Sequence, residues 1–196
     1  MDRSENRHYT LEEWQELLKE TGERYEYLDG RLNYLGGKDF TSWQHSKVVR
    51  NLVGELHILT KGTGWLLLNS QMKIMNEEAS EYNYADALIF KSKADILKLS
   101  DEEGMVNPYM IFEVVSDEDI DYKKGEKMYW YFAFPTLLEY VVIHCDKAEA
   151  WVFRRLNSKS GIESKFHQGL NASIELKSIS INLPLESIYN EVELSN

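Results

Sequence analysis

The sequence predicts a single α/β domain over residues 1–196, with a mixed central sheet flanked by helices and extended by β-hairpins. Helical patterns and strand-like runs are interspersed along the chain, as expected of this fold class. The apolar run Met110–Val115 is typical of a central strand covered on both faces. A chain of 196 residues can bury a proper hydrophobic core, and no linker or internal repeat divides it. We expect only residues 1–8 and 193–196 to be flexible ends.

The N-terminal part of the chain predicts a helix, a hairpin and a second helix. Thr10 and Glu13 have the spacing of a capping box, which starts the first helix. Asp29 and Gly30 separate two strand-like runs and favour a tight turn, because this turn needs positive φ at both central positions. The second helix, expected over about 43–61, shows a broad apolar face at helical spacing. This face consists of Val48, Val49, Leu52, Val53, Leu56 and Leu59.

The rest of the chain follows from the same kinds of pattern, with alternation indicating strands and Pro, Gly and polar clusters indicating their ends. The expected elements are strands at 65–68, 71–75, 84–90 and 110–115, a polar connection over 91–107 with a helical turn near 94–99, a helix over 121–134, a hairpin of strands 139–144 and 148–155, weaker strands at 162–166 and 173–179, and a short helical segment over 183–192.

Composition narrows the class of protein. The net charge of −11 argues against a general nucleic-acid coating protein, because sequence-independent binding needs clustered Lys and Arg. It leaves room for an enzyme with a local basic rim. No apolar run approaches the roughly 20 residues that span a bilayer, and the polar N-terminus lacks the core of a signal peptide. The single cysteine excludes an internal disulfide. We therefore expect a soluble cytoplasmic protein without a membrane partner.

Two acidic residues interrupt apolar strand runs and are the strongest functional signal in the sequence. Asp86 lies within Tyr84–Phe90, and Glu113 lies within Met110–Val115. Burying a carboxylate without a partner is costly. If the two strands are neighbours, the carboxylates can converge, and at ~4 Å they would repel by roughly 4 kcal/mol at an effective dielectric near 20. A shared proton, a lysine or a divalent cation must relieve that repulsion.

Carboxylate oxygens are hard ligands that suit Mg²⁺ or Mn²⁺, so we predict Asp86 and Glu113 as metal ligands. Mg²⁺ usually keeps positions for water and substrate phosphate, which fits metal-assisted hydrolysis of a phosphodiester. Lys127 lies on the following helix, on one stripe with Lys123 and Tyr131. Its ammonium could orient the attacking water and stabilise the transition state. Glu26 is a further candidate acid, as a metal ligand or an orienter of Lys127.

The order of these residues resembles the PD-(D/E)XK nuclease superfamily, and most of the chain resembles a bacterial family of restriction-endonuclease-like proteins, the Uma family. The resemblance implies a restriction-endonuclease-like fold, a Mg²⁺-dependent DNA endonuclease and a catalytic lysine on the helix, here Lys127. A homodimer is also expected, because cutting both DNA strands usually needs two sites. The matching segments are Tyr9–Trp14, Arg24–Gly30, His45, Tyr84–Asp86, Phe112–Ser116, Glu126–Lys127 with Tyr131, Glu139–Val142 and Leu183–Tyr189.

The chain departs from the family pattern around the same site. Ala85 stands where a proline usually precedes the aspartate, and Ser116–Asp119 replaces a Ser-Pro-Ser-Thr loop. Lys123 stands where the family commonly has an acid, four residues before the lysine, and Phe132–Pro135 replaces a glycine-containing turn. The acids and Lys127 are present, so we expect an intact site. The altered loop bears on substrate access and activity.

Each site residue also has a plainer interpretation. Asp86 alone could form a turn at a strand end, and Glu113 could pair with a buried Arg or Lys. Lys127 alone would be a solvated helix residue, and Glu26 could point outward from its strand. The order and spacing of the set favour the site interpretation over these.

Other candidates favour structural roles. His45 is expected to pack on Trp43 at the start of a helix rather than to act as a base, although the family pattern includes it. His144–Asp146 could suggest a nucleophilic dyad, but neighbours on a strand face opposite sides. Gln71 and Lys73 are expected to face water rather than line a cleft.

Two other functions stay open at this point. The acidic loop and the net charge fit a non-catalytic interaction or regulatory module on the same fold. A metal-dependent hydrolase for a small phosphate ester is a third function.

Overall fold

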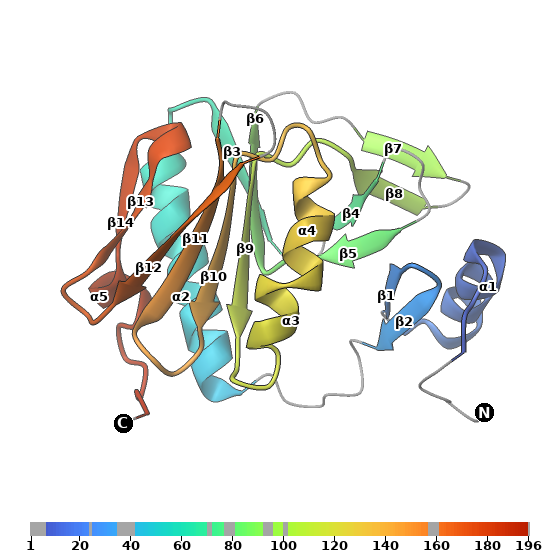
Figure 1. The fold of residues 1–196 in the computed structure, drawn as a ribbon, viewed down its shortest axis with the longest axis horizontal. Helices are drawn as coiled ribbons and strands as arrows, with labels where there is room; N and C mark the ends of the chain where they lie inside the picture. Colours follow the sequence, from blue (N-terminus) through green and yellow to red (C-terminus); the bar gives the residue numbers. More distant parts are fainter. Residues whose placement is uncertain are drawn as a thin grey trace.

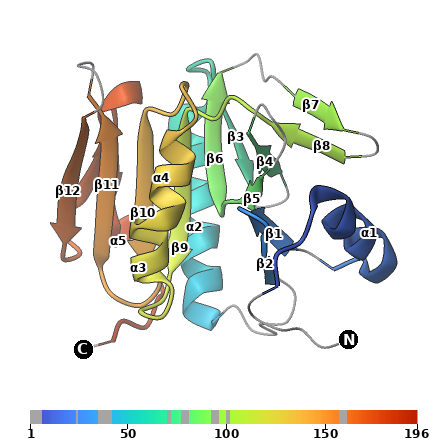
Figure 2. The same cartoon turned by 45° about the vertical axis from the view of Figure 1, so that its right-hand side comes forward.

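The computed structural model describes residues 7–23, 25–34, 42–69, 72–76, 81–91, 96–99, 102–156 and 161–195. Within them, two six-stranded sheets and a two-stranded ribbon are combined with helices (Figures 1 and 2). This confirms the expected α/β class, with a second sheet beside the central one. No helix in the described part of the chain is long and apolar enough to span a membrane.

The elements in chain order are α1 (Leu11–Thr21), β1 (Tyr25–Leu28), β2 (Arg31–Tyr34), α2 (Trp43–Thr60), β3 (Trp65–Asn69), β4 (Lys73–Met75), β5 (Tyr82–Tyr84), β6 (Ala87–Lys91), β7 (Ile96–Leu99), β8 (Glu102–Met105), β9 (Met110–Val115), α3 (Ile120–Lys124), α4 (Glu126–Phe132), β10 (Glu139–His144), β11 (Glu149–Arg155), β12 (Ile162–Gln168), β13 (Ser173–Leu176), the 3₁₀ helix η1 (Lys177–Ile179), β14 (Ile181–Pro184) and α5 (Leu185–Ile188).

The central sheet has the order β12-β11-β10-β9-β6-β3. It is mixed, because β9 and β10 are parallel and are connected through α3 and α4, whereas its other neighbours are antiparallel. Figure 1 shows α2 behind this sheet and α3 and α4 in front of it. Alternate residues of β9 therefore enter two cores: Phe112 and Val114 pack in the α2 core, and Ile111 and Val115 pack in the α4 core.

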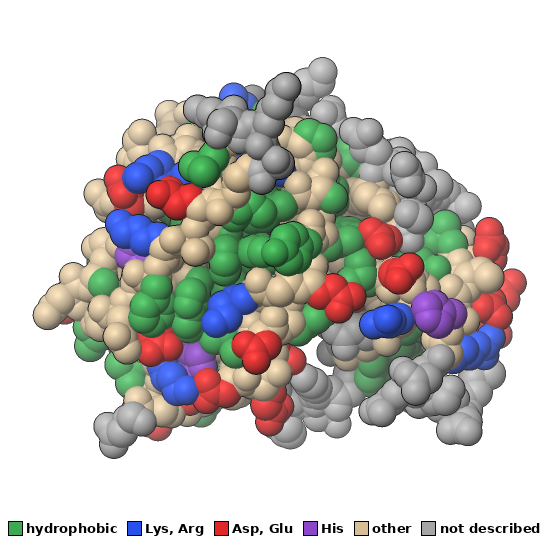
Figure 3. All heavy atoms as spheres, in the orientation of Figure 1, with side chains coloured by type: hydrophobic (Ala, Val, Ile, Leu, Met, Phe, Trp, Pro, Cys, Tyr) green, Lys and Arg blue, Asp and Glu red, His purple; other side chains and the backbone are tan. Residues whose placement is uncertain are grey.

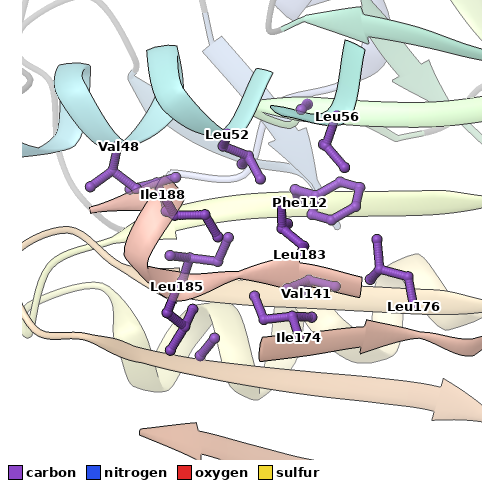
Figure 4. Close-up of a cluster of buried hydrophobic side chains, with 14 of the residues drawn as sticks. Val48, Leu52, Leu56, Phe112, Val141, Ile174, Leu176, Leu183, Leu185 and Ile188 are labelled. Carbon is purple, nitrogen blue, oxygen red and sulfur yellow. The ribbon is translucent and has the colours of Figure 1, made fainter. Parts of the chain in front are cut away.

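The predicted apolar face of α2 is the main support of the first core. Val48, Leu52 and Leu56 are fully buried and point toward the sheet in Figure 4. They share one cluster with Phe112 of β9 and with residues of β13, β14 and α5, among them Leu183. Each such side chain contributes about 1.5–3 kcal/mol by leaving water. This packing fixes the N-terminus of α2 relative to the end of β9.

The second sheet has the order β2-β1-β5-β4-β8-β7 and packs against α1 through Trp14, which stacks on Tyr27 and Tyr82. The capping box at Thr10 is confirmed. The hairpin turn is confirmed as well, with φ of 47° at Asp29 and 73° at Gly30.

The expected strand 84–90 is wrong in one instructive respect. The chain leaves the second sheet after β5 and enters the central sheet as β6, so Asp86 lies between two strands rather than inside one. The backbone amide of Asp86 donates to the carbonyl of Phe112, and its carboxylate accepts from the amide of Val114. These bonds to β9 replace strand pairing at the point where the chain changes sheets.

Three other expectations need correction. The helical turn expected near 94–99 is wrong, since Ile96–Leu99 is β7 and pairs with β8, while residues 92–95 lie outside the described ones. The expected helix 121–134 is broken at Gly125 into α3 and α4. The expected strand 173–179 ends at Leu176, and the expected helical segment 183–192 is helical only as α5.

Of the expected flexible ends, residues 1–6 and 196 lie outside the described chain. Ser195 is attached, because it donates hydrogen bonds to the backbone and side chain of Asp146.

Candidate active site

A cavity of about 900 Å³ opens where the two sheets meet. Its walls come from the N-terminal turns of α2, the junction between β5 and β6, the end of β9 with the loop to α3, and the end of β10. Three of the four predicted site residues line it, namely Glu26, Asp86 and Glu113. The fourth, Lys127, is not among the lining residues and has no exposed surface.

Asp86 is held rigidly at one wall of the cavity. Its Oδ2 atom accepts a hydrogen bond of 2.7 Å from the amide of Val114 and lies 3.6 Å from Nε2 of His45. Burial raises the pKa of Asp86, but the neighbouring His45 and the Val114 amide outweigh it, so the pKa is below the usual aspartate value. The side chain is therefore a carboxylate near neutral pH.

Glu113 lies on the same wall and is almost completely buried. Its Oε1 atom accepts a hydrogen bond of 2.8 Å from the hydroxyl of Tyr131 and lies 2.7 Å from Nζ of Lys127. Its Oε2 atom accepts from Nζ of Lys123 at 2.8 Å. The predicted stripe of Lys123, Lys127 and Tyr131 therefore meets at Glu113, although the helix that carries it is broken.

Lys127 lies beneath the cavity and joins the two sheets. Its ammonium donates to Glu26 on β1 and to the carbonyl of Tyr84, in addition to its contact with Glu113. Burial alone lowers the pKa of Lys127, but the charges of Glu113 and Glu26 raise it above the usual lysine value. Burial raises the pKa of Glu26, and Lys127 outweighs this effect and lowers it. Lys127 and Glu26 are therefore both ionised near neutral pH.

Lys123 is the residue at this site to which we assigned no role. It lines the cavity, and its side chain is 16% exposed, whereas that of Lys127 is 0% exposed. The sequence signals for it were its helical spacing from Lys127 and its departure from the family pattern. That spacing alone does not distinguish a site lysine from a solvated one.

Acidic residues form the outer wall of the cavity. Asp117, Glu118 and Asp119, from the altered loop between β9 and α3, all line it. Figure 3 shows acidic side chains grouped at the lower edge of the molecule, where β9 passes into α3. An anionic substrate would meet repulsion here unless cations offset it.

The expectation that His144–Asp146 point to opposite sides is wrong. β10 ends at His144, and the ligand atoms of the three residues lie within 4.8 Å of one another at the cavity wall. The imidazole contacts Asp117 at 3.0 Å and Asp146 at 2.9 Å. Burial raises the pKa of Cys145, which disfavours a thiolate nucleophile.

The structure also bears on the expectations for Lys73, Gln71 and His45. Lys73 is buried rather than water-facing, with its ammonium 5.1 Å from the ring centroids of both Trp14 and Tyr82, while Gln71 lies outside the described residues. The Nδ1 atom of His45 is buried without a hydrogen-bond partner, while its Nε2 faces Asp86.

The comparisons with known proteins agree with this architecture. The family described as "Uma2: Putative restriction endonuclease" matches residues 11–186. The chain belongs to the Uma2 family. This confirms the family resemblance seen in the sequence, and the matched range contains Glu26, Asp86, Glu113 and Lys127.

Two Synechocystis sp. proteins, both described as uncharacterized, are similar along most of their length. The protein sll1609 is 24% identical over 176 residues, covering 88% of this chain and 94% of its own. The protein slr1290 is 23% identical over 177 residues, covering 90% of this chain and 87% of its own.

One solved structure, described as a putative nuclease from Anabaena variabilis ATCC 29413, superimposes with a TM-score of 0.70. It is 16% identical in sequence, and the match covers 92% of this chain and 97% of that one. At this identity the likeness concerns the fold, and together with the Uma2 match it supports the restriction-endonuclease-like architecture.

Proposed function

We propose that this protein is a Mg²⁺- or Mn²⁺-dependent endonuclease that hydrolyses phosphodiester bonds in DNA. The observation that carries the proposal is that Asp86 and Glu113 line one cavity, with Asp86 bonded to the residue next to Glu113. Membership of the Uma2 family, described as "Putative restriction endonuclease", supports the same chemistry.

The residues at the cavity fit a hard divalent cation. Asp86 and Glu113 supply carboxylate oxygens, the donors that Mg²⁺ and Mn²⁺ prefer, and we propose them as the ligands. When bound, such an ion polarises a phosphate oxygen and lowers the pKa of bound water. Two lysine contacts oppose this fit, because the ammonium of Lys127 lies at Oε1 of Glu113 and that of Lys123 lies at Oε2.

The remaining residues hold these carboxylates in place. The amide of Val114 fixes Asp86, while Tyr131 and Lys127 fix Oε1 of Glu113. Such support keeps ligands in position without reorganisation when substrate arrives. The sequence led us to expect that Lys127 assists the attacking water. Its complete burial favours a positioning role that acts through Glu113 and Glu26.

The acidic outer wall affects how DNA would bind. Glu118 and Asp119 repel phosphate, whereas the charge of Asp117 is offset by Lys147, and the whole chain carries a net charge of −11. We therefore propose that DNA binding depends on divalent cations, which offset this repulsion more effectively than monovalent ions do at equal concentration. We also propose that a homodimer cuts both strands, because each chain supplies one such cavity.

Plasmid nicking with Mg²⁺ or Mn²⁺ tests the proposal. Asp86→Asn and Glu113→Gln should each reduce nicking at least about a hundredfold, because each removes a proposed ligand charge. Glu163→Gln is the matched control, since Glu163 on β12 pairs with Arg154 of β11 and does not line the cavity. Undiminished nicking by the Asp86 and Glu113 variants would refute the assignment.

A non-catalytic interaction or regulatory module is the second candidate function. The acidic outer wall and the lysine on Glu113 favour it, because both oppose an anionic substrate or a metal ion. Calorimetry that detects no binding of Mg²⁺ or Mn²⁺, together with nuclease assays that detect no cleavage, would support this module.

The cavity volume also lies in the range of small-molecule sites. A screen of phosphate esters would therefore separate a small phosphoesterase from the endonuclease.

A further inference from the structure

Lys123 differs from its neighbour Lys127 in a way that matters for metal binding. Both ammonium groups contact Glu113, Lys127 at Oε1 and Lys123 at Oε2. Lys127 is sealed in the core by Glu26 and the carbonyl of Tyr84. Lys123 has Glu113 as the one side-chain partner that the structure records for its ammonium, and it stands at the cavity wall.

The charge of Lys123 also reaches the other acids of the site. Lys123 lines the same cavity as Asp86 and Glu26, so its positive charge acts on these two acids as well as on Glu113. Its ammonium thus relieves the repulsion between the carboxylates that a divalent ion would otherwise relieve. The ammonium of Lys123, which belongs to the chain itself, therefore already provides the charge compensation that a divalent ion would provide.

We propose that Lys123 is a tethered cation that competes with the divalent ion for Glu113, so that metal binding requires its ammonium to leave Oε2. The inference rests on the proposed metal site and describes how that site is regulated.

The local structure allows Lys123 to leave. Its side chain is partly exposed, and it comes from α3, a helix of five residues that ends at the break before Gly125. Its long aliphatic part can redirect the ammonium into the cavity while the backbone stays in place. Lys127, with no exposed surface, has no such path.

Calorimetric titration of the full chain with Mn²⁺ alone tests the competition. Lys123→Met, which keeps the aliphatic length and removes the charge, should bind Mn²⁺ about tenfold or more tightly than the unmodified chain. Lys123→Arg, which keeps the charge, should bind as weakly as the unmodified chain. Lys124→Met is the matched control, because Lys124 stacks on the ring of Trp151 and does not line the cavity. Its affinity should be unchanged.

Equal or weaker Mn²⁺ binding by Lys123→Met would overturn the inference, as would an equal gain in Lys124→Met. If Lys123→Met folds poorly, Lys123→Gln gives the same test with a polar side chain. Thermal unfolding supplies a second readout, in which Mn²⁺ should raise the melting temperature of the charge-removed variant more than that of the unmodified chain. Both readouts are independent of hydrolysis. Tighter binding without nicking would therefore remove the endonuclease proposal and keep this one.

Discussion

The Nζ atom of Lys127 lies 2.7 Å from Oε1 of Glu113, and the lysine side chain has no exposed surface. The same ammonium donates to Glu26 on β1, a strand of the other sheet. One buried cation therefore neutralises an acid from each of the two sheets. Its removal would leave both carboxylates buried without this partner, so its structural importance can be tested apart from catalysis.

Lys127→Met should lower the free energy of unfolding by about 3–5 kcal/mol, the usual cost of removing one member of a buried charge cluster. Urea denaturation measures this loss. Lys124→Met is the control on the preceding helix, since Lys124 lies 4.2 Å from the ring centroid of Trp151 and forms no ion pair with a buried acid among the described residues. It should cost no more than about 1 kcal/mol. Equal losses in the two variants would contradict a special role for Lys127.

The sequence could predict those site residues whose burial follows from their apolar neighbours along the chain. Asp86 and Glu113 stand out because apolar residues surround them in the sequence, and the structure places both at one cavity. The depth of Lys127 was not predictable, because it depends on a strand about a hundred residues earlier that supplies Glu26. The role of Lys123 was missed for a different reason, because it lies only ten residues from Glu113 and helical spacing alone does not distinguish a site lysine from a solvated one.

The fold was predictable where a local signal is strong, as in the capping box at Thr10 and the turn at Asp29. The prediction failed where tertiary contacts override the local sequence pattern. Residues 84–90 look like one strand, yet hydrogen bonds from Asp86 to β9 divide them between two sheets. Residues 121–134 look like one helix until the break at Gly125 is seen in the structure.

Acid should weaken the contact between Glu26 and Lys127. Burial raises the pKa of Glu26, but the charge of Lys127 outweighs burial and lowers the pKa below the usual glutamate value. A group with a lowered folded pKa adds stability above its unfolded pKa and loses it as pH falls through the folded value. The free energy of unfolding should therefore decrease as the pH falls below about 4.5, and this decrease should be less steep in Glu26→Gln. Denaturation between pH 7 and pH 3 measures both slopes, and identical slopes would exclude this linkage.

The hydroxyl of Tyr131 should contribute through its hydrogen bond to Oε1 of Glu113, which is 2.8 Å long. Tyr131→Phe keeps the ring and removes the donor, so it should cost about 1.5–3 kcal/mol, the range for bonds to charged groups. Tyr129→Phe makes the same change on the same helix at a side chain that is 69% exposed. Chemical denaturation should show little change there. A neutral result at Tyr131 would mean that the two lysines alone hold Glu113.

Gly125 sets the angle between the helices that carry Lys123 and Lys127, and a side chain there should disturb both. A Cβ atom at this position would lie 2.8 Å from the backbone carbonyl oxygen of Asp121, closer than such contacts allow. Gly125→Ala should therefore destabilise the protein by about 1–3 kcal/mol, a typical overpacking cost. Gly54→Ala offers the opposite case.

Gly54 lies within α2, and a Cβ atom there would meet nothing within 4 Å. The substitution to alanine should stabilise the protein by up to about 1 kcal/mol through helix propensity. Thermal unfolding of the two variants side by side gives the comparison. Opposite shifts in melting temperature would support a steric requirement for glycine at the break, because the chemical change is the same in both. If Gly125→Ala were as stable as Gly54→Ala, the break between α3 and α4 would have to originate in the packing of Glu113 against the two lysines.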